Sequence, residues 1–305
     1  MKYYYSKKDF QLAEKYTKIV LGVDELYRKN TEDGEESFSK EGLIPVSLCG
    51  IEPKKIDNWD NAKKELKNIY EEYKNINNTI RANYMTEQIF SVITLGNWVL
   101  DKKKIEYRNL VKELLYVNPM PVTENQQNSY HKRLDKLLSN KNYYGSLEEK
   151  LKAWRKDNLV SKNDIEETLI NIMKKAKEET YYLGFKEIEN VRVKPLIVTD
   201  VPYQAYCDYF GGEMHVNGDL GYTYQDLKHL ICHETFPGHT THMHIRKIRC
   251  EKGDIPLDSS LVFTNTASSP LFEGIADNSL KFINWMKNDD DEISDIFQKM
   301  KAAAA

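Results

Sequence analysis

One stretch of the sequence, ICHETFPGHTTHMHI, crowds four of the chain's seven histidines around a proline and a glycine. Just before it, Thr223 and Asp226 have the spacing of a capping box, and apolar residues follow three and four positions apart. This pattern predicts a helix that leads into the histidines. Pro237 removes one backbone hydrogen bond of that helix, and its ring clashes with the carbonyl four residues earlier. A straight helix through this segment is therefore not expected.

The interruption separates two histidines by six residues. On an ideal helix the side chains of His233 and His239 would point roughly 120° apart, too far around the axis to share one metal ion. Gly238 tolerates backbone angles that other residues avoid, so Pro237 and Gly238 together can bend or bulge the helix and bring His239 back beside His233. Glu234 would then reach a water molecule at the same metal. We expect the helix breaker to be part of the ligand geometry.

A zinc hydrolase needs a third protein ligand and an open coordination position for water. After a loop rich in serine, threonine and asparagine, the segment SSPLFEGIADNSLKFINWM predicts a second helix with Glu273 near its start. Zinc hydrolases that pair a histidine motif with a downstream helical glutamate use this arrangement. Asp277, one turn later, is placed to hydrogen-bond a ligand histidine.

The rest of the chain predicts a mainly α fold. Apolar residues at helical spacing fill the first 185 residues, which we expect to form a helical body with solvated Lys- and Glu-rich faces. Near residue 190 the pattern changes: VRVKPLIVTDVP predicts a strand, and AYCDYFGGEMHVNG predicts a β-hairpin next to the metal-binding helix. The segment 32–42 predicts a surface loop. The predicted helical ranges are 7–30, 56–76, 80–103, 104–116, 125–140, 146–156 and 161–185, the last with a capping box of Ser161 and Asp164.

Composition excludes some classes of function. The 305 residues carry a net charge of −3 with a pI near 6.2, so there is no basic surplus to neutralise phosphates and nucleic acid is not an expected partner. No apolar run approaches the roughly 18 residues of a membrane span, and the first residues lack a signal-peptide pattern, which predicts a cytoplasmic protein without membrane contact. Four cysteines without CxxC spacing predict neither a disulfide framework nor a thiolate zinc site.

The motifs HETFPGH and FEGIAD, with GGEMHVNGD upstream, resemble the bacterial DUF885 family, in which HExxPGHxxQ is followed by EGWA. The family belongs with the HExxH metallopeptidases of gluzincin-like type. The resemblance covers roughly residues 190–285 and implies a zincin-like α+β catalytic region within 186–305, either a separate domain or continuous with the helical body at 1–185. It also implies that the segment GGEMHVN forms an edge strand along a peptide substrate. The implied zinc ligands are His233, His239 and Glu273, with Glu234 as general base.

The chain departs from the family pattern at two positions. His242 stands where the family has glutamine, and Ile275 stands where it has the tryptophan of EGWA. Members of the family are usually much longer, which leaves open whether the C-terminus at residue 305 is complete and which residue stabilises the oxyanion.

Other assignments stay open. His229 and His233 are four residues apart and His239 and His242 are three apart, so either pair also has ligand spacing on a helix. A third alternative is that these histidines are ordinary surface or packing residues. The side chains expected to contact substrate or to support the metal ligands are His242, Asp277, His215, Tyr206, Tyr209 and Tyr222.

The leading prediction is a zinc-dependent hydrolase of peptide or small amide substrates, in which Glu234 takes a proton from the metal-activated water and passes it to the leaving amine. Two histidines and a carboxylate also form the facial triad of non-haem iron oxygenases, although no jelly-roll strand pattern accompanies them here. The third class is a zinc-binding scaffold without catalytic activity. The sequence does not indicate the oligomeric state or the choice between endopeptidase, exopeptidase and amidase.

Overall fold

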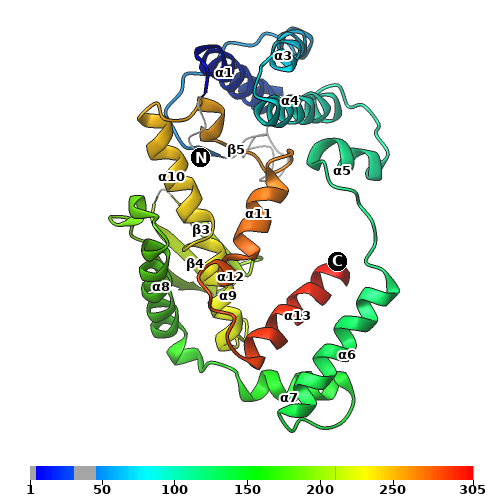
Figure 1. The fold of residues 1–305 in the computed structure, drawn as a ribbon, viewed down its shortest axis with the longest axis vertical. Coiled ribbons are helices and arrows are strands. Elements are labelled where there is room, and N and C mark those ends of the chain that lie inside the picture. Colours follow the sequence, from blue (N-terminus) through cyan, green and yellow to red (C-terminus); the bar gives the residue numbers. More distant parts are fainter. Residues whose placement is uncertain (1–4, 31–45, 210, 305) are drawn as a thin grey trace. The chain divides into compact units, whose positions relative to one another are not determined.

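The computed structural model describes residues 5–30, 46–209 and 211–304 (Figure 1). Within them the fold is mainly helical with a small three-stranded sheet, which confirms the predicted fold class at that level. The surface loop predicted at 32–42 lies outside the described residues. In the parts of the chain described here, no helix combines the length and the apolar character that crossing a membrane requires.

Contacts within the chain divide it into two compact units. Helices of the expected helical body are found in both units, so the division differs from the expected boundary between residues 185 and 186. The reason is that α6 and α8 pack against helices from the C-terminal half of the chain, and contacts rather than chain order define the units. Unit 1 is Met1–Pro119 with Ile245–Glu273, and unit 2 is Met120–His244 with Gly274–Ala305.

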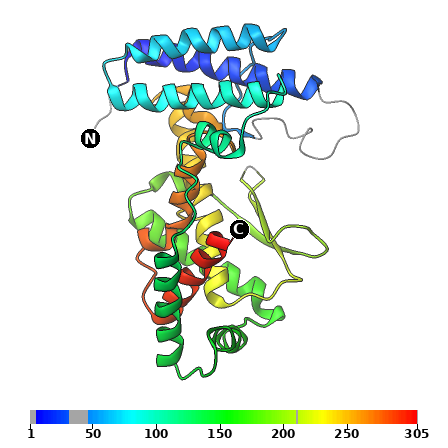
Figure 2. The same cartoon turned by 90° about the vertical axis from the view of Figure 1, so that its right-hand side faces the viewer.

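Three long helices form the core of unit 1, lying side by side in the views of Figures 1 and 2. Their apolar faces meet in one cluster that includes Tyr16, Leu66 and Ile89. A two-stranded antiparallel ladder, which the sequence analysis did not predict, joins β1 (Val46–Ser47) to β5 (Leu261–Val262). The described helices that lie wholly within unit 1 are α1 (Lys7–Asn30), α3 (Trp59–Lys74), α4 (Thr79–Val99), α5 (Tyr107–Leu115) and the 3₁₀ turn η3 (Leu257–Ser260).

A buried ion network ties these elements together. Arg81 on α4 donates through Nε to Asp9 Oδ1 at 3.1 Å and through Nη1 to Asp258 Oδ2 at 2.9 Å. The Tyr73 hydroxyl donates to the same Asp9 carboxylate at 3.1 Å. All three charged residues are at most 8% exposed. Because a buried charge without a partner is costly, this network fixes η3 against α1 and α4 within unit 1.

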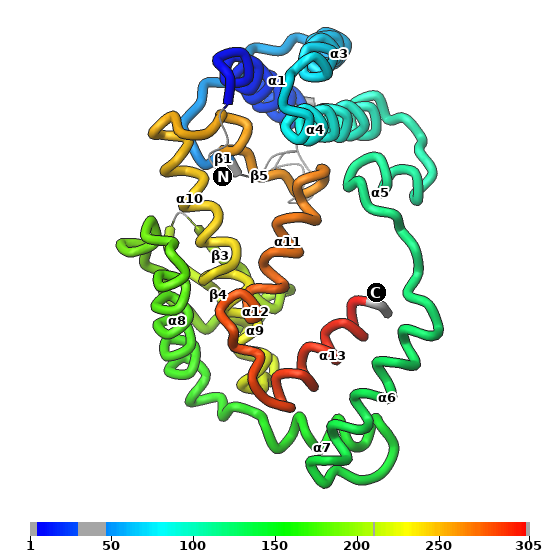
Figure 3. Tube along the Cα trace, viewed as in Figure 1, coloured from blue at the N-terminus to red at the C-terminus, as the bar shows by residue number. Residues whose placement is uncertain are grey.

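Unit 2 is built around α9 (Tyr224–Glu234). Its apolar face, with Leu227 and Ile231 fully buried, packs against α8 and the sheet, and α12 and α13 also contact it (Figure 3). Lys228 anchors α9 to α13 through an ion pair of 2.6 Å with Asp291. The other helices of unit 2 are α6 (Glu124–Asn140), α7 (Leu147–Asp157), α8 (Ile165–Tyr182), α12 (Ser279–Phe282) and α13 (Asp289–Ala304).

The predicted strand and hairpin are confirmed. The sheet has the order β2 (Lys194–Val198), β4 (Glu213–Asn217), β3 (Ala205–Asp208), with β4 antiparallel to β3 and parallel to β2. The expectation that GGEMHVN forms an edge strand is wrong, because β4 pairs on both sides and takes the central position. The edges are β2 and β3.

One of the two predicted capping boxes forms. Thr223 Oγ1 accepts from the Asp226 backbone N–H at 3.1 Å, and Asp226 accepts in return from the Thr223 N–H at 3.0 Å. The box predicted at Ser161 is wrong: a 3₁₀ turn, η1 (Lys162–Asp164), takes up the first turn, and Ser161 makes no side-chain cap bond. The predicted helix therefore begins as α8 at Ile165.

Candidate metal centre

The predicted interruption is a complete break between two helices. α9 ends at Glu234, and α10 (His239–Glu251) begins after Pro237 and Gly238. The backbone N–H of Gly238 donates to Cys232 O at 3.0 Å. A Cβ on Gly238 would overlap the carbonyl oxygen of His233, so glycine is the residue that lets the two segments approach this closely.

The break brings two imidazoles together. His233 Nε2 and His239 Nε2 lie 3.2 Å apart, and the two rings meet edge to face with centroids 4.8 Å apart. Zinc with tetrahedral ligands at its usual bond lengths holds neighbouring ligand atoms about 3.3 Å from one another. His239 is 6% exposed, whereas its position six residues along an unbroken helix would have turned it away from His233. The two nitrogens therefore have the spacing that one zinc ion requires.

Helix α11 (Ser269–Asp277) carries the carboxylates of Glu273 and Asp277. Glu273, His233 and His239 form one candidate ligand group, in which one ligand atom of each residue lies within 4.8 Å of the other two. The single helix predicted over this segment ends at Asp277, and the short α12 follows it.

Asp277 orients the imidazole of His233 by a hydrogen bond to its Nδ1 atom. The Nδ1–H of His233 donates to Asp277 Oδ1 at 3.0 Å, which leaves Nε2 directed at His239. Asp277 Oδ1 is also 3.9 Å from His229 Nε2. Burial and the neighbouring His233 lower the pKa of His229, against the opposing effect of Asp277. The second imidazole has a comparable neighbour, because His239 Nδ1 and His242 Nε2 lie 3.1 Å apart.

Glu234 lies beside the two imidazoles, not among the three potential ligands. Its Oε1 is 4.0 Å from His233 Nε2, and its Oε2 accepts a hydrogen bond of 3.0 Å from the Tyr209 hydroxyl. Tyr209 directly follows β3, and its ring lies edge-on to His239 with centroids 6.1 Å apart. The hairpin thus positions a carboxylate beside the site.

The other tyrosines of the sequence prediction lie elsewhere. Tyr222 is 1% exposed and donates to the backbone carbonyls of Asn217 and Gln204, so it packs the core of unit 2 and does not line an open site. Tyr206 is exposed and stacks edge-on with His215 on the neighbouring strand, at a centroid distance of 6.1 Å. These two pair across the hairpin and belong to neither of the candidate ligand groups.

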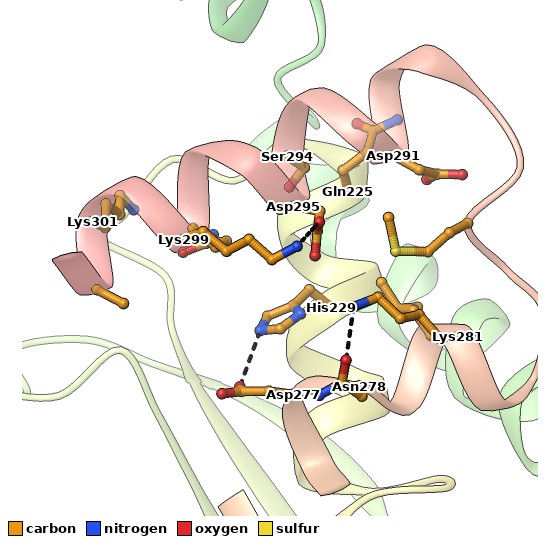
Figure 4. A pocket seen from close by; sticks show the side chains of 14 residues that line it. Gln225, His229, Asp277, Asn278, Lys281, Asp291, Ser294, Asp295, Lys299 and Lys301 are labelled. Atoms are coloured by element: carbon orange, nitrogen blue, oxygen red, sulfur yellow. Dashed lines mark hydrogen bonds and ion pairs between the residues drawn. The ribbon is translucent and has the colours of Figure 1, made fainter. Parts of the chain in front are cut away.

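A pocket of about 390 Å³ in unit 2 adjoins the site and was not predicted. His229 and Asp277 face each other on its wall, and α13 forms another side (Figure 4). Helix α13 was not predicted, although the Asn288 side chain caps it by accepting from the Asp291 N–H at 2.9 Å. The run NDDDEIS, with its acidic first turn after an asparagine, could have indicated this helix start.

The centre therefore combines two imidazole nitrogens, a carboxylate oxygen and a separate, positioned carboxylate. Such a donor set suits zinc, which accepts nitrogen and oxygen ligands and leaves one position open in catalytic sites with three protein ligands. Comparison of the chain with models of protein families, with curated proteins and with solved structures finds no match.

Proposed function

We propose that this protein is a zinc-dependent hydrolase of peptide or other amide bonds, with a zincin-like catalytic region of the type that its resemblance to the DUF885 family implies. The observation that carries the proposal is the approach of His233 Nε2 to His239 Nε2, 3.2 Å, with Glu273 in the same group and Glu234 beside it.

Zinc held by this group would supply a water of lowered pKa and polarise the substrate carbonyl. Glu234 would accept the proton of that water and deliver it to the leaving amine. The Tyr209 hydroxyl holds one oxygen of Glu234 at 3.0 Å and leaves the other on the side of His233. Asp277 keeps the His233 ring in the orientation that exposes Nε2 to the shared site.

The position of Glu234 favours a hydrolase over the two competing classes. An iron oxygenase uses its two histidines and its carboxylate as ligands and needs no further carboxylate to take a proton from water. A structural zinc site usually has four protein ligands, whereas the candidate group here has three. A glutamate adjacent to a ligand histidine, and oriented by a tyrosine, is suited to water activation.

The sheet offers a place for an extended substrate. β3 (Ala205–Asp208) is an edge strand of the three-stranded sheet and leads directly to Tyr209, which contacts Glu234. A peptide that adds to this edge by backbone hydrogen bonds would lie beside the catalytic carboxylate. We therefore assign the substrate strand to β3, not to the central strand β4.

The test separates metal binding from proton transfer. Glu234→Gln should retain one zinc ion per chain and lose activity on a peptide library by about 10²–10⁴-fold, the usual contribution of a general base. Glu251→Gln, an exposed glutamate at the end of α10, is the matched control and should cleave as the parent protein does. Cleavage by the parent protein should stop on chelation and return with zinc.

Two results would contradict the proposal. In one, the zinc-loaded parent protein cleaves no member of the library in a chelator-sensitive manner. In the other, Glu234→Gln cleaves as fast as the control, and the base is then a different residue.

A further inference from the structure

The wall between the metal centre and the pocket contains a second group of potential ligands. His229 and His233 lie one turn apart on α9, and Asp277 Oδ1 faces both of them. The oxygen is 3.0 Å from His233 Nδ1 and 3.9 Å from His229 Nε2, and one ligand atom of each of the three residues lies within 4.8 Å of the other two. These separations bracket the spacing of about 3.3 Å between neighbouring ligands of a zinc ion.

The pocket gives this group access to solvent. His229 and Asp277 lie on its wall, and polar side chains of α9, α12 and α13 surround them (Figure 4). The Asp277 side chain is 60% exposed, so an ion can reach it without opening the core. The uncharged polar side chains of Gln225, Ser294 and Gln298 line the same pocket and can hydrogen-bond the water molecules of an incoming ion.

We propose that His229, Asp277 and the Nδ1 atom of His233 form a second, weaker zinc site, distinct from the site that uses His233 Nε2. The two sites share one imidazole ring and face opposite sides of it. All residues of the second site belong to unit 2. Its expected effect on activity, inhibition by excess zinc, rests on the proposed function; the binding itself does not.

The shared ring makes the second ion weaker than the first. A neutral imidazole has one proton, and in His233 this proton lies on Nδ1, where it bonds to Asp277. An ion that binds Nδ1 takes the place of this proton, which leaves to solvent. Two divalent cations on one ring also repel each other. Occupation of the second site therefore removes the hydrogen bond by which Asp277 orients His233, and we expect it to inhibit.

The experiment titrates the metal-free full chain with Zn²⁺ by calorimetry, and with Co²⁺ by absorption, because neither readout depends on hydrolysis. The parent protein should bind two ions, the second at least tenfold more weakly. His229→Ala should keep the tight ion and lose the weak one, whereas His239→Ala should lose the tight ion and keep the other. His131→Ala, at an exposed position of α6 and outside both groups, is the matched control and should bind both.

Circular dichroism of each variant first establishes that it is folded, and His229→Gln replaces His229→Ala if the alanine variant is not. The proposal is overturned if the parent protein binds a single ion, or if replacing His229 weakens the tight ion. Two ions with the expected pattern in a protein that cleaves no amide would uphold the second site and refute the proposed function. Chelator-sensitive cleavage by a protein that binds a single ion would uphold the proposed function and refute the second site.

Discussion

Replacing Gly238 by alanine tests the geometry on which the metal centre depends. The added Cβ would overlap the carbonyl oxygens of His233 and Cys232, both of which are backbone atoms that cannot rotate away. The start of α10 must therefore move relative to the end of α9. This movement carries His239 with it, because His239 is the first residue of α10.

The expected losses of stability and of zinc affinity follow from the contacts of Gly238. The Gly238 N–H donates to Cys232 O at 3.0 Å, and the His242 N–H donates to Gly238 O at 3.2 Å. Loss of the two bonds costs about 1 kcal/mol each, and overpacking adds about 1–3 kcal/mol, so the free energy of unfolding should fall by about 3–5 kcal/mol. Metal–ligand distances tolerate about 0.2 Å, whereas relief of the overlap needs a shift on the order of 1 Å, so zinc affinity should fall at least about 100-fold.

Urea unfolding of the metal-free protein and zinc competition against a chromophoric chelator measure the two quantities separately. Gly274→Ala is the matched control, since its Cβ would meet nothing within 4 Å and it lies in α11 next to Glu273. This control should keep its zinc affinity and gain about 0.5–1 kcal/mol, because alanine is the better helix former. If Gly238→Ala binds zinc as tightly as the control does, the close approach of the two helices is not what creates the site.

Three further predictions concern stability and thiol chemistry. Thr223→Ala should lower the free energy of unfolding by about 1 kcal/mol through loss of its cap, whereas Ser161→Ala, whose hydroxyl makes no cap bond, should change it by less than about 0.5 kcal/mol in the same urea titration. Arg81→Met should cost about 3–5 kcal/mol, because it leaves two buried carboxylates without their partner; an unchanged urea midpoint would refute this reading of the network. Cys49 should react first with iodoacetamide at pH 8, because it is only half-buried whereas the other three thiols are buried. Burial also raises the pKa of the Cys207 and Cys250 thiols to about 12, which keeps both protonated at pH 8. Peptide mapping that shows equal labelling of all four cysteines in the folded protein would contradict this prediction.

The predictable parts of the fold were those that local chemistry decides. Helix α1 runs over the predicted range 7–30, and the glycine pair between two alternating segments gave the hairpin. In both cases the signal is contained in neighbouring residues: apolar spacing in the helix, and a turn in which Gly212 takes a positive φ of 69°. The capping box at Thr223 also formed, since both of its partners lie within four residues of each other.

The parts that could not be predicted depend on distant partners. β4 is central because β2 joins it in parallel, and no local pattern distinguishes a central strand from an edge strand as short as this one. The division into units depends on which apolar faces meet, and helical spacing alone does not name the partner of a face. The proximity of His229 to Asp277 also could not be predicted, because it depends on how α9 meets the end of α11.

The break between α9 and α10 leaves carbonyls that the next turn of chain must satisfy, and two threonines do this. Thr240 Oγ1 donates to Glu234 O at 3.0 Å, and Thr241 Oγ1 donates to Thr235 O at 3.3 Å. Thr235 O also accepts from the Thr241 backbone N–H at 3.2 Å, so its pairing does not depend on the hydroxyl alone. Thr240 is buried, and loss of its bond to Glu234 O would cost about 1–3 kcal/mol. The bonds also fix the backbone of Glu234 to the residue that follows His239. The pair of threonines thus couples the position of the base to the position of the second ligand, which a continuous helix would do through its own backbone.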